Sequence, residues 1–284
     1  MNFSIRPMRE ADLAAAMRLK NAEGWNQTEA DWAFYLEHDP ELCLVAEAEG
    51  EVVGTVMAIN YNYEVAWIGM MIVEKPYRKL GVSTALLHEV IARLKDCQSI
   101  KLDASPAGSY VYEGLGFEME LELQRMVATR LASPSDFENS PEITRIEKSD
   151  IPALIDFDCK VFGTNRTSLI HHLADSRLEN GWIARENNQV SGFLLIREGT
   201  LYHQVGPLFA QTEALACRLF FLAAKHLDGN PVTVDIHTSK SEFKNFLLSL
   251  GFETQRPFYR MYLKQNPFPG LPHCQFTLAS PEVG

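Results

Sequence analysis

The sequence predicts a mixed α/β protein made of two halves with one topology. Its 284 residues exceed the length of a typical single domain of about 100–150 residues. The segments LGFEMELELQRM (residues 115–126) and LGFETQRPFYRM (residues 250–261) share Leu-Gly-Phe-Glu and Arg-Met at a constant offset of 135 residues. Apolar β-branched runs alternate with helical patterns in the same order in both halves. We therefore expect two tandem domains, each a mostly antiparallel sheet flanked by helices.

In the first half, FSIRPM predicts a short strand, and a helix is expected after Asp12. A second helix is expected after Thr28, because its hydroxyl and Asp31 three residues later resemble a capping box. Residues 41–73 contain three apolar runs separated by EGE and NYNYE, which predicts a three-stranded meander. A helical stripe begins at Leu80. SIKLDA then predicts a strand, AGSYVYEGLG a short helix, and the segment after Phe117 a final pair of strands.

The second half repeats this order. Strands are expected at EITRIE, GWIARE, QVSGFLLIRE, TLYHQVGPLF and PVTVDI, and helices after Ser149, Thr167, Gln211 and Thr238, with further strands after Phe252. ASPSDFENSPE is polar and holds two prolines, which is typical of a linker. We therefore expect a first domain over residues 1–131, a linker over 132–142, a second domain over 143–265, and an irregular or disordered proline-rich tail over 266–284.

Composition and charge narrow the class of protein. Hydrophobic residues make up 46% and charged residues 22%, as in globular proteins. No apolar run approaches the roughly 20 residues that span a bilayer, and the N-terminus lacks a signal-peptide core, so we expect a cytoplasmic protein without a membrane partner. Residues 1–140 hold 22 acidic against 12 basic residues. This acidity argues against nucleic acid and favours a cationic small molecule, although it also serves solubility.

A phosphate-binding pattern follows the third strand. MMIVEKPYRKLGVSTALL places a buried strand, a short turn and Arg-Lys-Leu-Gly-Val-Ser directly before an apolar helix. The free N–H groups and the positive dipole end of a helix N-terminus converge there, and Arg78 and Lys79 add charge. Gly81 has no Cβ to obstruct a pyrophosphate or a tight turn. Taken alone, the pattern is also compatible with an ordinary strand-to-helix turn.

Two consecutive segments resemble the GCN5-related N-acetyltransferase family. Arg-x-x-Gly-x-Ser at residues 78–83 is similar to the family's motif A, (Q/R)-x-x-G-x-(G/A), with serine in the last small position. LDASPAGSYVYEGLGF, residues 102–117, is similar to the strand, short helix and Tyr-x-x-x-Gly-Phe that follow in the family. The resemblance covers roughly residues 5–130 and implies acetyl-coenzyme A as co-substrate. It implies that the pantetheine arm meets the backbone of Ile72 and Val73, and that the pyrophosphate is bound by Arg78, Lys79, Leu80, Gly81, Val82, Ser83 and Thr84.

The resemblance also implies a reaction. Tyr112 stands where the family places a general acid, and a phenol of pKa about 10 is suited to protonating a departing thiolate. A neutral amine would attack the thioester directly while Tyr112 protonates the sulfur. From its position in the sequence, Tyr112 is also compatible with packing against the sheet.

Candidates for the base and the acceptor site carry less specific signals. The amine must lose a proton, and Glu64, in the NYNYE turn before the third strand, is the nearest candidate base, with a solvated turn glutamate as the alternative. Trp25 and Asn26 fall between the first two helices, where the family shapes its acceptor pocket. The indole of Trp25 would stack on a cationic acceptor, unless it belongs to the core.

The second half lacks the corresponding residues. Shifted by 135 residues, R-K-L-G at residues 78–81 becomes E-A-L-A at residues 213–216, and Tyr112 becomes Leu247. A carboxylate repels phosphate and leucine donates no proton, so we expect a degenerate second domain that kept the fold and lost the cofactor site. We expect this domain to close over the acceptor side, with Asp158, His203 and Asp235 as candidate substrate contacts.

The leading hypothesis is an acetyl-coenzyme A-dependent N-acetyltransferase acting on a small-molecule amine, as a monomer or homodimer. The alternatives are a non-catalytic coenzyme A-binding or regulatory module and an acyltransferase for longer acyl chains. The five cysteines lie far apart, with no spacing suited to a metal, so no metal is expected.

Overall fold

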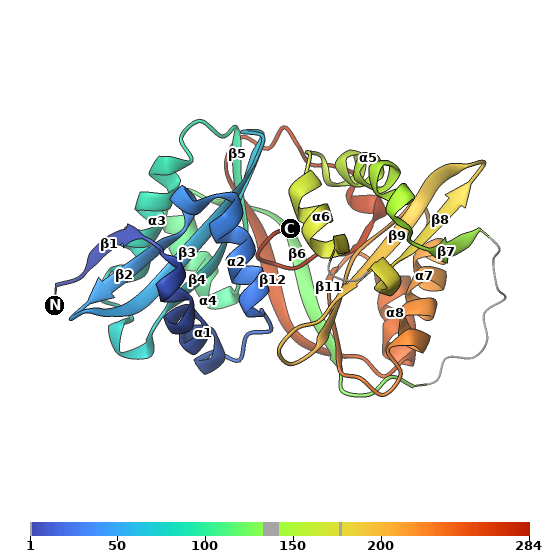
Figure 1. Ribbon diagram of the computed structural model, residues 1–284, viewed down its shortest axis with the longest axis horizontal. Helices are drawn as coiled ribbons and strands as arrows, with labels where there is room; N and C mark the ends of the chain where they lie inside the picture. The colour runs from blue at the N-terminus through green and yellow to red at the C-terminus, as the bar shows by residue number, and fades with distance from the viewer. Residues whose placement is uncertain (1, 133–141, 176–177) are drawn as a thin grey trace.

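The computed structural model describes residues 2–132, 142–175 and 178–284 and has two lobes side by side (Figure 1). The first half contains β1 (Ser4–Pro7), α1 (Leu13–Ala22), α2 (Glu29–His38), β2 (Leu44–Ala48), β3 (Glu51–Tyr61), β4 (Val65–Val73), α3 (Val82–Arg93), β5 (Ser99–Ala104), α4 (Pro106–Gly114) and β6 (Glu118–Ala128). The second half contains β7 (Ile143–Arg145), α5 (Ile151–Phe162), α6 (Thr167–Asp175), β8 (Trp182–Glu186), β9 (Gln189–Arg197), β10 (His203–Ala210), α7 (Glu213–His226), β11 (Val232–His237), α8 (Ser241–Ser249), β12 (Glu253–Lys264) and β13 (Gln275–Thr277).

Local signals explain most of these elements. The capping box before α2 is confirmed, because Thr28 Oγ1 accepts from Asp31 N at 3.3 Å and Asp31 Oδ2 accepts from Thr28 N at 2.6 Å. The meander of β2, β3 and β4 is confirmed by its antiparallel pairing. Helix α3 buries its apolar stripe, including Leu86 and Val90, against the sheet. None of the helices formed by the described residues is both long and apolar enough to cross a bilayer.

One mixed sheet runs through both lobes. The described residues form thirteen strands in the order β1-β2-β3-β4-β5-β12-β6-β11-β13-β10-β9-β8-β7. Strand β12 of the second half pairs with β5 of the first, and β6 of the first half pairs with β11 of the second, so the two strands cross between the lobes (Figure 1). The prediction of a final pair of strands after Phe117 is wrong, because the described residues of the first half form one strand there, β6, whereas the strands predicted after Phe252 are present as β12 and β13. Each half contributes one long strand after its last helix, and that strand's neighbours include the other half.

The repeated arginines hold this exchange together. Arg125 on β6 donates to both carboxylate oxygens of Asp235 on β11, each at 2.8 Å. Arg260 on β12 donates to both oxygens of Asp103 on β5, at 2.9 and 3.0 Å. All four side chains are buried. The arginine of the shared Arg-Met therefore forms, in each half, an ion pair with an aspartate on a strand of the other half.

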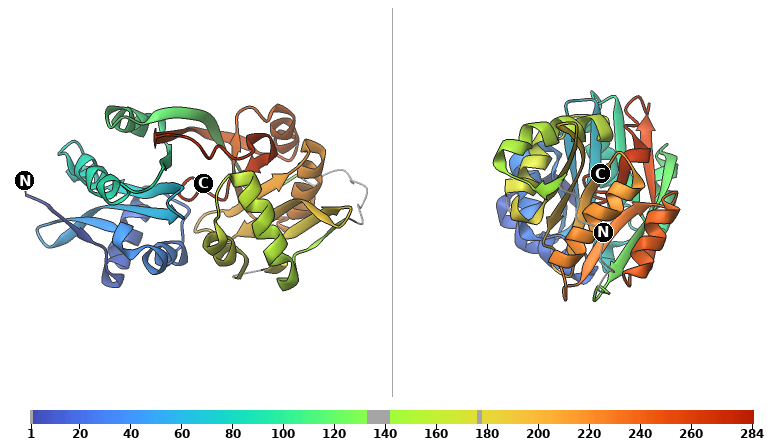
Figure 2. Two further views of the ribbon diagram at one scale, coloured as in Figure 1. Left: turned by 90° about the horizontal axis from the view of Figure 1, so that it is seen from above. Right: turned by 90° about the vertical axis from the view of Figure 1, so that its right-hand side faces the viewer.

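The C-terminal segment is buried between the lobes (Figure 2). Of the two alternatives expected for the tail, an irregular wrap or disorder, disorder is wrong for residues 272–284, which form a 3-10 turn, β13 and a final turn, while residues 265–271 are irregular. Trp67 Nε1 donates to Pro281 O at 2.9 Å and the hydroxyl of Tyr61 donates to Val283 O at 3.0 Å. Apolar side chains such as Phe276 and Val283 are almost fully buried, which offsets the entropy of ordering the segment.

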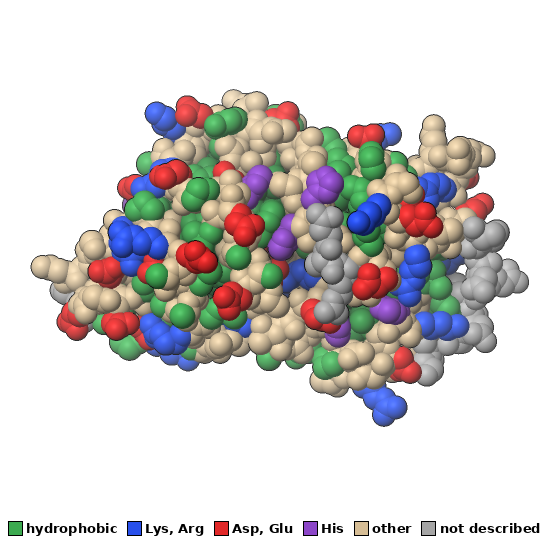
Figure 3. Space-filling model, viewed as in Figure 1, with side chains coloured by type: hydrophobic (Ala, Val, Ile, Leu, Met, Phe, Trp, Pro, Cys, Tyr) green, Lys and Arg blue, Asp and Glu red, His purple; other side chains and the backbone are tan. Residues whose placement is uncertain are grey.

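Helices α2 and α6 meet where the lobes join. Histidine side chains gather on this face of the molecule (Figure 3). The ring of His172 stacks on Phe34 with centroids 4.3 Å apart, and His38 Nε2 lies 3.1 Å from Ser168 Oγ. The expected linker lies almost wholly in residues 133–141, outside the described residues, so the expected domain boundaries stay a proposal.

Candidate functional site

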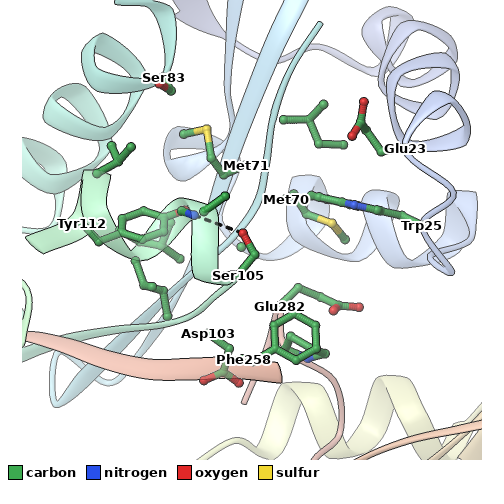
Figure 4. Close-up of a pocket in the computed structure, with 18 of the residues that line it drawn as sticks. Glu23, Trp25, Met70, Met71, Ser83, Asp103, Ser105, Tyr112, Phe258 and Glu282 are labelled. Atoms are coloured by element: carbon green, nitrogen blue, oxygen red, sulfur yellow. Dashed lines mark hydrogen bonds between the residues drawn. The ribbon is translucent and has the colours of Figure 1, made fainter. Parts of the chain in front are cut away.

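A gap between two parallel strands forms the main cavity. Within the described residues, β4 and β5 pair only from Val65↔Ser99 to Trp67↔Lys101. A bulge then bends β4, where Met70 has a φ of +51° and its carbonyl accepts from Thr55 Oγ1 at 2.7 Å. A cavity of about 440 Å³ opens beside the diverging part of β4, with Tyr112 and Ser83 on one side and Trp25 and Glu23 on the other (Figure 4).

The loop between β4 and α3 borders one end of this cavity. Arg78 Nε donates to Val73 O at 2.9 Å, and its terminal nitrogen contacts Glu23 Oε1 at 2.6 Å. Gly81 has a φ of +83°, which favours glycine, and it begins α3 with Ala85 N donating to Gly81 O as the first helical bond. The backbone N–H groups of the first turn therefore have no intrahelical acceptor and suit an anion.

The predicted cofactor residues divide into two groups. Ile72, Val73, Arg78 and Ser83 line the cavity. Lys79, Leu80, Gly81, Val82 and Thr84 form the loop and the first turn of α3. Among these, the side chain of Val82 is buried in the core while Leu80 is 48% exposed. Such residues would bind a phosphate through backbone N–H groups.

Tyr112 faces the cavity from α4. Its ring packs edge-on against Phe117 at a centroid distance of 5.8 Å and lies over Gly108, where an added Cβ would be 3.3 Å from Tyr112 Cε2. Ser105 begins the helix by accepting from Gly108 N at 3.2 Å (Figure 4). Burial raises the pKa of Tyr112 to about 12. The phenol is thus neutral at physiological pH and able to donate a proton.

The other end of the cavity is built by both lobes. The loop after α1 contributes Glu23 and Trp25, and Trp25 lies beside Met70 (Figure 4). From the exchanged strands and the C-terminal segment come Arg125, Arg256, Phe258, Pro281 and Glu282. Sequence reasoning missed these five residues. The two repeat segments contain Arg125, Arg256 and Phe258, but they do not show that these residues meet, because strand exchange and burial of the tail are not visible in local patterns.

Glu64 lies away from the cavity. It precedes Val65 at the paired end of β4, whereas the cavity opens along the other end. Its carboxylate accepts a hydrogen bond from the hydroxyl of Thr164. The turn therefore joins the two lobes, and Glu64 is withdrawn as a candidate base.

The candidate acceptor residues are only partly brought together. Trp25 lines the cavity, while Asn26 Oδ1 accepts from Leu201 N and Tyr202 N, both at 2.9 Å, and borders a neighbouring hollow of about 220 Å³. Asp235 does not line the cavity itself but forms an ion pair with Arg125, which does. Two candidates lie elsewhere: buried Asp158 pairs with Arg166 at 2.7 Å, and His203 begins β10.

The corresponding gap in the second half is occupied by the chain itself. Strands β10 and β11 pair in parallel only at His203↔Val232 and Gln204↔Thr233. Strand β13 then inserts between them, with Thr277 opposite both Leu208 and Ile236. At the start of α7, Glu213 Oε1 accepts from Phe243 N at 2.6 Å. The predicted loss of the second site therefore has a structural counterpart, because a strand takes the place that is open in the first half.

No metal centre is evident in the part of the chain that the structure describes: its His, Cys, Asp and Glu side chains form no group of three that could hold an ion. The cavity is instead lined by cationic and anionic side chains and by the phenol of Tyr112, beside the edge of β4 that the described residues leave unpaired.

Comparisons with known sequences identify relatives of both halves. A profile described as "Acetyltransferase (GNAT) family" matches residues 9–117, and one described as "Acetyltransferase (GNAT) domain" matches residues 154–276. A protein named holothin acyltransferase from a Pseudoalteromonas strain is 28% identical over 93% of this chain and 88% of its own length. An uncharacterised N-acetyltransferase of Bacillus subtilis is 22% identical over 92% of each chain.

Solved structures share the whole arrangement. A putative acetyltransferase from Pyrococcus horikoshii superposes with a TM-score of 0.83 over 99% of this chain and 96% of its own, at 20% identity. A tandem GNAT protein from the clavulanic acid biosynthesis pathway superposes with a TM-score of 0.63 over 94% and 99%, at 12% identity. At these identities the likeness shows the fold.

Proposed function

Since the chain belongs to the GCN5-related N-acetyltransferase family, with two such domains in tandem, we propose that it transfers an acetyl group from acetyl-coenzyme A to the amine of a small molecule. It is an acyltransferase; the acetyl donor, the acceptor and the role of Tyr112 are the proposed part. The gap between β4 and β5, with Arg78 at one end and Tyr112 along its side, is the observation that supports the proposal most.

The residues around this gap fit coenzyme A. Ile72 and Val73 line the cavity in the bulged half of β4, where that strand diverges from β5 and leaves room for an extended arm beside it. The first turn of α3 offers N–H groups and Arg78 a charge to a pyrophosphate. Bound there, the coenzyme supplies an acyl group activated as a thioester.

Tyr112 is proposed as the general acid. The amine nitrogen forms a bond to the carbonyl carbon, the carbon–sulfur bond breaks, and the phenol donates a proton to the departing thiolate. Glu23 is proposed as the acceptor of the amine proton in place of Glu64. Its carboxylate lines the cavity, and its side chain is 25% exposed, so the proton can pass to solvent.

The test is turnover of acetyl-coenzyme A with a panel of chemically diverse amines, using Tyr112→Phe and a matched control. Tyr110 lies on the same helix and is 76% exposed, so Tyr110→Phe makes the same chemical change, loss of a phenol hydroxyl, at a residue that does not line the cavity. We expect Tyr112→Phe to lower kcat by roughly 10²- to 10⁴-fold while the affinity for coenzyme A holds. Turnover of no amine by the native protein, with coenzyme A still bound, would favour a non-catalytic module.

Longer acyl groups belong in the same assay, because the Pseudoalteromonas relative is named an acyltransferase. Propionyl- and butyryl-coenzyme A should react more slowly than the acetyl donor. Faster turnover of a longer donor would replace the acetyl part of the proposal and leave the reaction class unchanged.

A further inference from the structure

Arg256 in the cavity wall forms no ion pair with the described residues. Its Nε atom is buried and makes no hydrogen bond to the described residues, and its guanidinium lies 4.7 Å from the centroid of the Phe258 ring. The other charged side chains of the wall are each in an ion pair: Arg78 with Glu23, Arg125 with Asp235, Glu282 with Arg197, and Asp103 with Arg260. Arg256 is therefore a cation that the described part of the chain leaves uncompensated.

The backbone places Arg256 in a position that lowers the stability of the fold. A bulge interrupts the β6–β12 pairing between Thr254 and Arg256, and it leaves Arg256 directly opposite Arg125. Like charges at opposed positions of a strand pair are destabilising. Bulges that re-aim a side chain are enriched beside active sites. An unpaired cation, opposed by a second cation, is difficult to explain by stability but is expected of a binding residue.

Charged side chains near Arg256 in the described part of the chain act on it without forming an ion pair with it. Burial and the charge of Arg125 lower the pKa of Arg256, against the opposing effect of Asp235 and Glu282. Each of these two carboxylates already accepts hydrogen bonds from another arginine, Asp235 from Arg125 and Glu282 from Arg197, which also pairs with Asp31 at 2.7 Å. A negatively charged group of a ligand would give the guanidinium of Arg256 the direct ion pair that it lacks among the described residues.

The position of Arg256 assigns this ligand to the acceptor. Arg256 lines both the main cavity and the neighbouring hollow of about 220 Å³, together with Glu23 and Arg125. The ring of Phe258, over which Arg256 lies, is on the side of the cavity away from Ser83 and the phosphate-binding loop (Figure 4). The pyrophosphate of the coenzyme is thus accounted for by other residues.

We propose that the acceptor is a small amine that also carries a carboxylate, and that Arg256 binds this carboxylate while the amine faces Tyr112 and Glu23. The inference rests on the proposed acyl transfer. A guanidinium matches a carboxylate through two parallel hydrogen bonds, and a single unpaired arginine matches one negative charge better than a phosphate dianion. The guanidinium of Arg256 also makes a favourable cation–π contact with the ring of Phe258.

The experiment compares amino acids with their amides. The common α-amino acids, β-alanine and 4-aminobutyrate are assayed beside the carboxamide of each, and aminoethyl phosphate is included. The variants are Arg256→Gln, Arg256→Lys and the control Arg218→Gln, which removes one positive charge from the exposed face of α7. Binding of coenzyme A and the midpoint of thermal unfolding are measured for every variant.

We expect the native enzyme to prefer at least one acid over its amide by 10-fold or more in kcat/KM. Arg256→Gln should remove that preference through a roughly 10- to 100-fold loss with the acid and little change with the amide, because one charge-assisted contact is lost. The acid-over-amide preference of Arg256→Lys should lie between those of the native enzyme and Arg256→Gln. The preference of Arg218→Gln should match that of the native enzyme.

Equal or better turnover of amides, or of aminoethyl phosphate, would overturn the inference and leave the acyltransferase proposal intact. An acid preference that survives in folded Arg256→Gln would also overturn it. If the native protein neither binds coenzyme A nor acetylates any amine, the proposed function on which the inference rests is overturned instead.

Discussion

Removing Arg260 should strongly destabilise the fold. Its side chain is 5% exposed and that of Asp103 fully buried, with two hydrogen bonds of 2.9 and 3.0 Å between them. The pair joins β12 of one half to β5 of the other. Breaking a buried ion pair by removing one partner costs about 3–5 kcal/mol, since an uncompensated buried charge remains. Against a total stability of about 5–15 kcal/mol, this is a large fraction.

Urea unfolding of three variants measures this effect. Arg260→Met and Asp103→Leu should each lower the free energy of unfolding by about 3–5 kcal/mol. The double variant should be much less destabilised than the sum of the two, because neither charge is then left unpaired. The control is Arg93→Met, which removes exposed contacts of α3: the ion pair with Glu89, where the side chains are 27% and 44% exposed, and the hydrogen bond and ion pair with Glu41, whose side chain is 85% exposed. Exposed ion pairs contribute at most about 1 kcal/mol each, so this variant should lose much less stability than Arg260→Met.

Two results would refute this reasoning. Single variants that lose less than about 1 kcal/mol would show that the charges are not desolvated. A double variant that loses the full sum would show that packing, rather than charge pairing, holds the exchanged strands.

Three further predictions follow from the geometry. Because burial raises the pKa of Tyr112 to about 12, kcat should show no loss from phenol ionisation up to about pH 11, and a descending limb near pH 10 that is absent in Tyr112→Phe would contradict this. Gly69→Ala should lower stability by about 1–3 kcal/mol in urea unfolding, since its Cβ would lie 2.6 Å from Glu282 O, whereas Gly114→Ala, with open space around it, should not. Burial lowers the pKa of His237 to about 3, so between pH 6.5 and 3 the unfolded chain binds more protons than the folded one. The free energy of unfolding should therefore fall as the pH drops through that window. His237→Gln should flatten this pH dependence, and an unchanged slope in the variant would contradict the prediction.

Elements with local signals were predicted well. The meander of residues 41–73, the capping box at Thr28 and the loop before α3 follow from apolar period, cap chemistry and glycine, all of which act within a few residues. EMELELQRMVA was expected to be a strand region, but its alternation does not encode which strand lies beside it. Partners of a strand are set by distant segments. The exchange of β6 and β12 was therefore missed.

The candidate site was predicted on one side only. Arg78, Ser83 and Tyr112 belong to segments with recognisable spacing, and the structure brings them to one cavity. The opposite wall depends on Arg256 and Glu282, which lie more than 140 residues along the chain from Tyr112. Arg256 lies in the repeat segment at a position that the first copy does not share, and Glu282 lies in a segment without a motif. Their place in the cavity wall, the ion pair of Glu282 with Arg197 and the lack of one at Arg256 among the described residues are properties of the folded chain, and only these distinguish them from surface charges.

The two gaps of this protein show where local information ends. By itself, the sequence determined that each half forms the same strands and helices, and that the R-K-L-G loop and the tyrosine occur in the first half alone. Folding in three dimensions decided that β13 enters the gap between β10 and β11, whereas the gap between β4 and β5 stays open as a cavity. The physical reason is that an exposed strand edge pairs with whichever backbone the rest of the chain brings to it. In the second half that backbone is the chain's own tail.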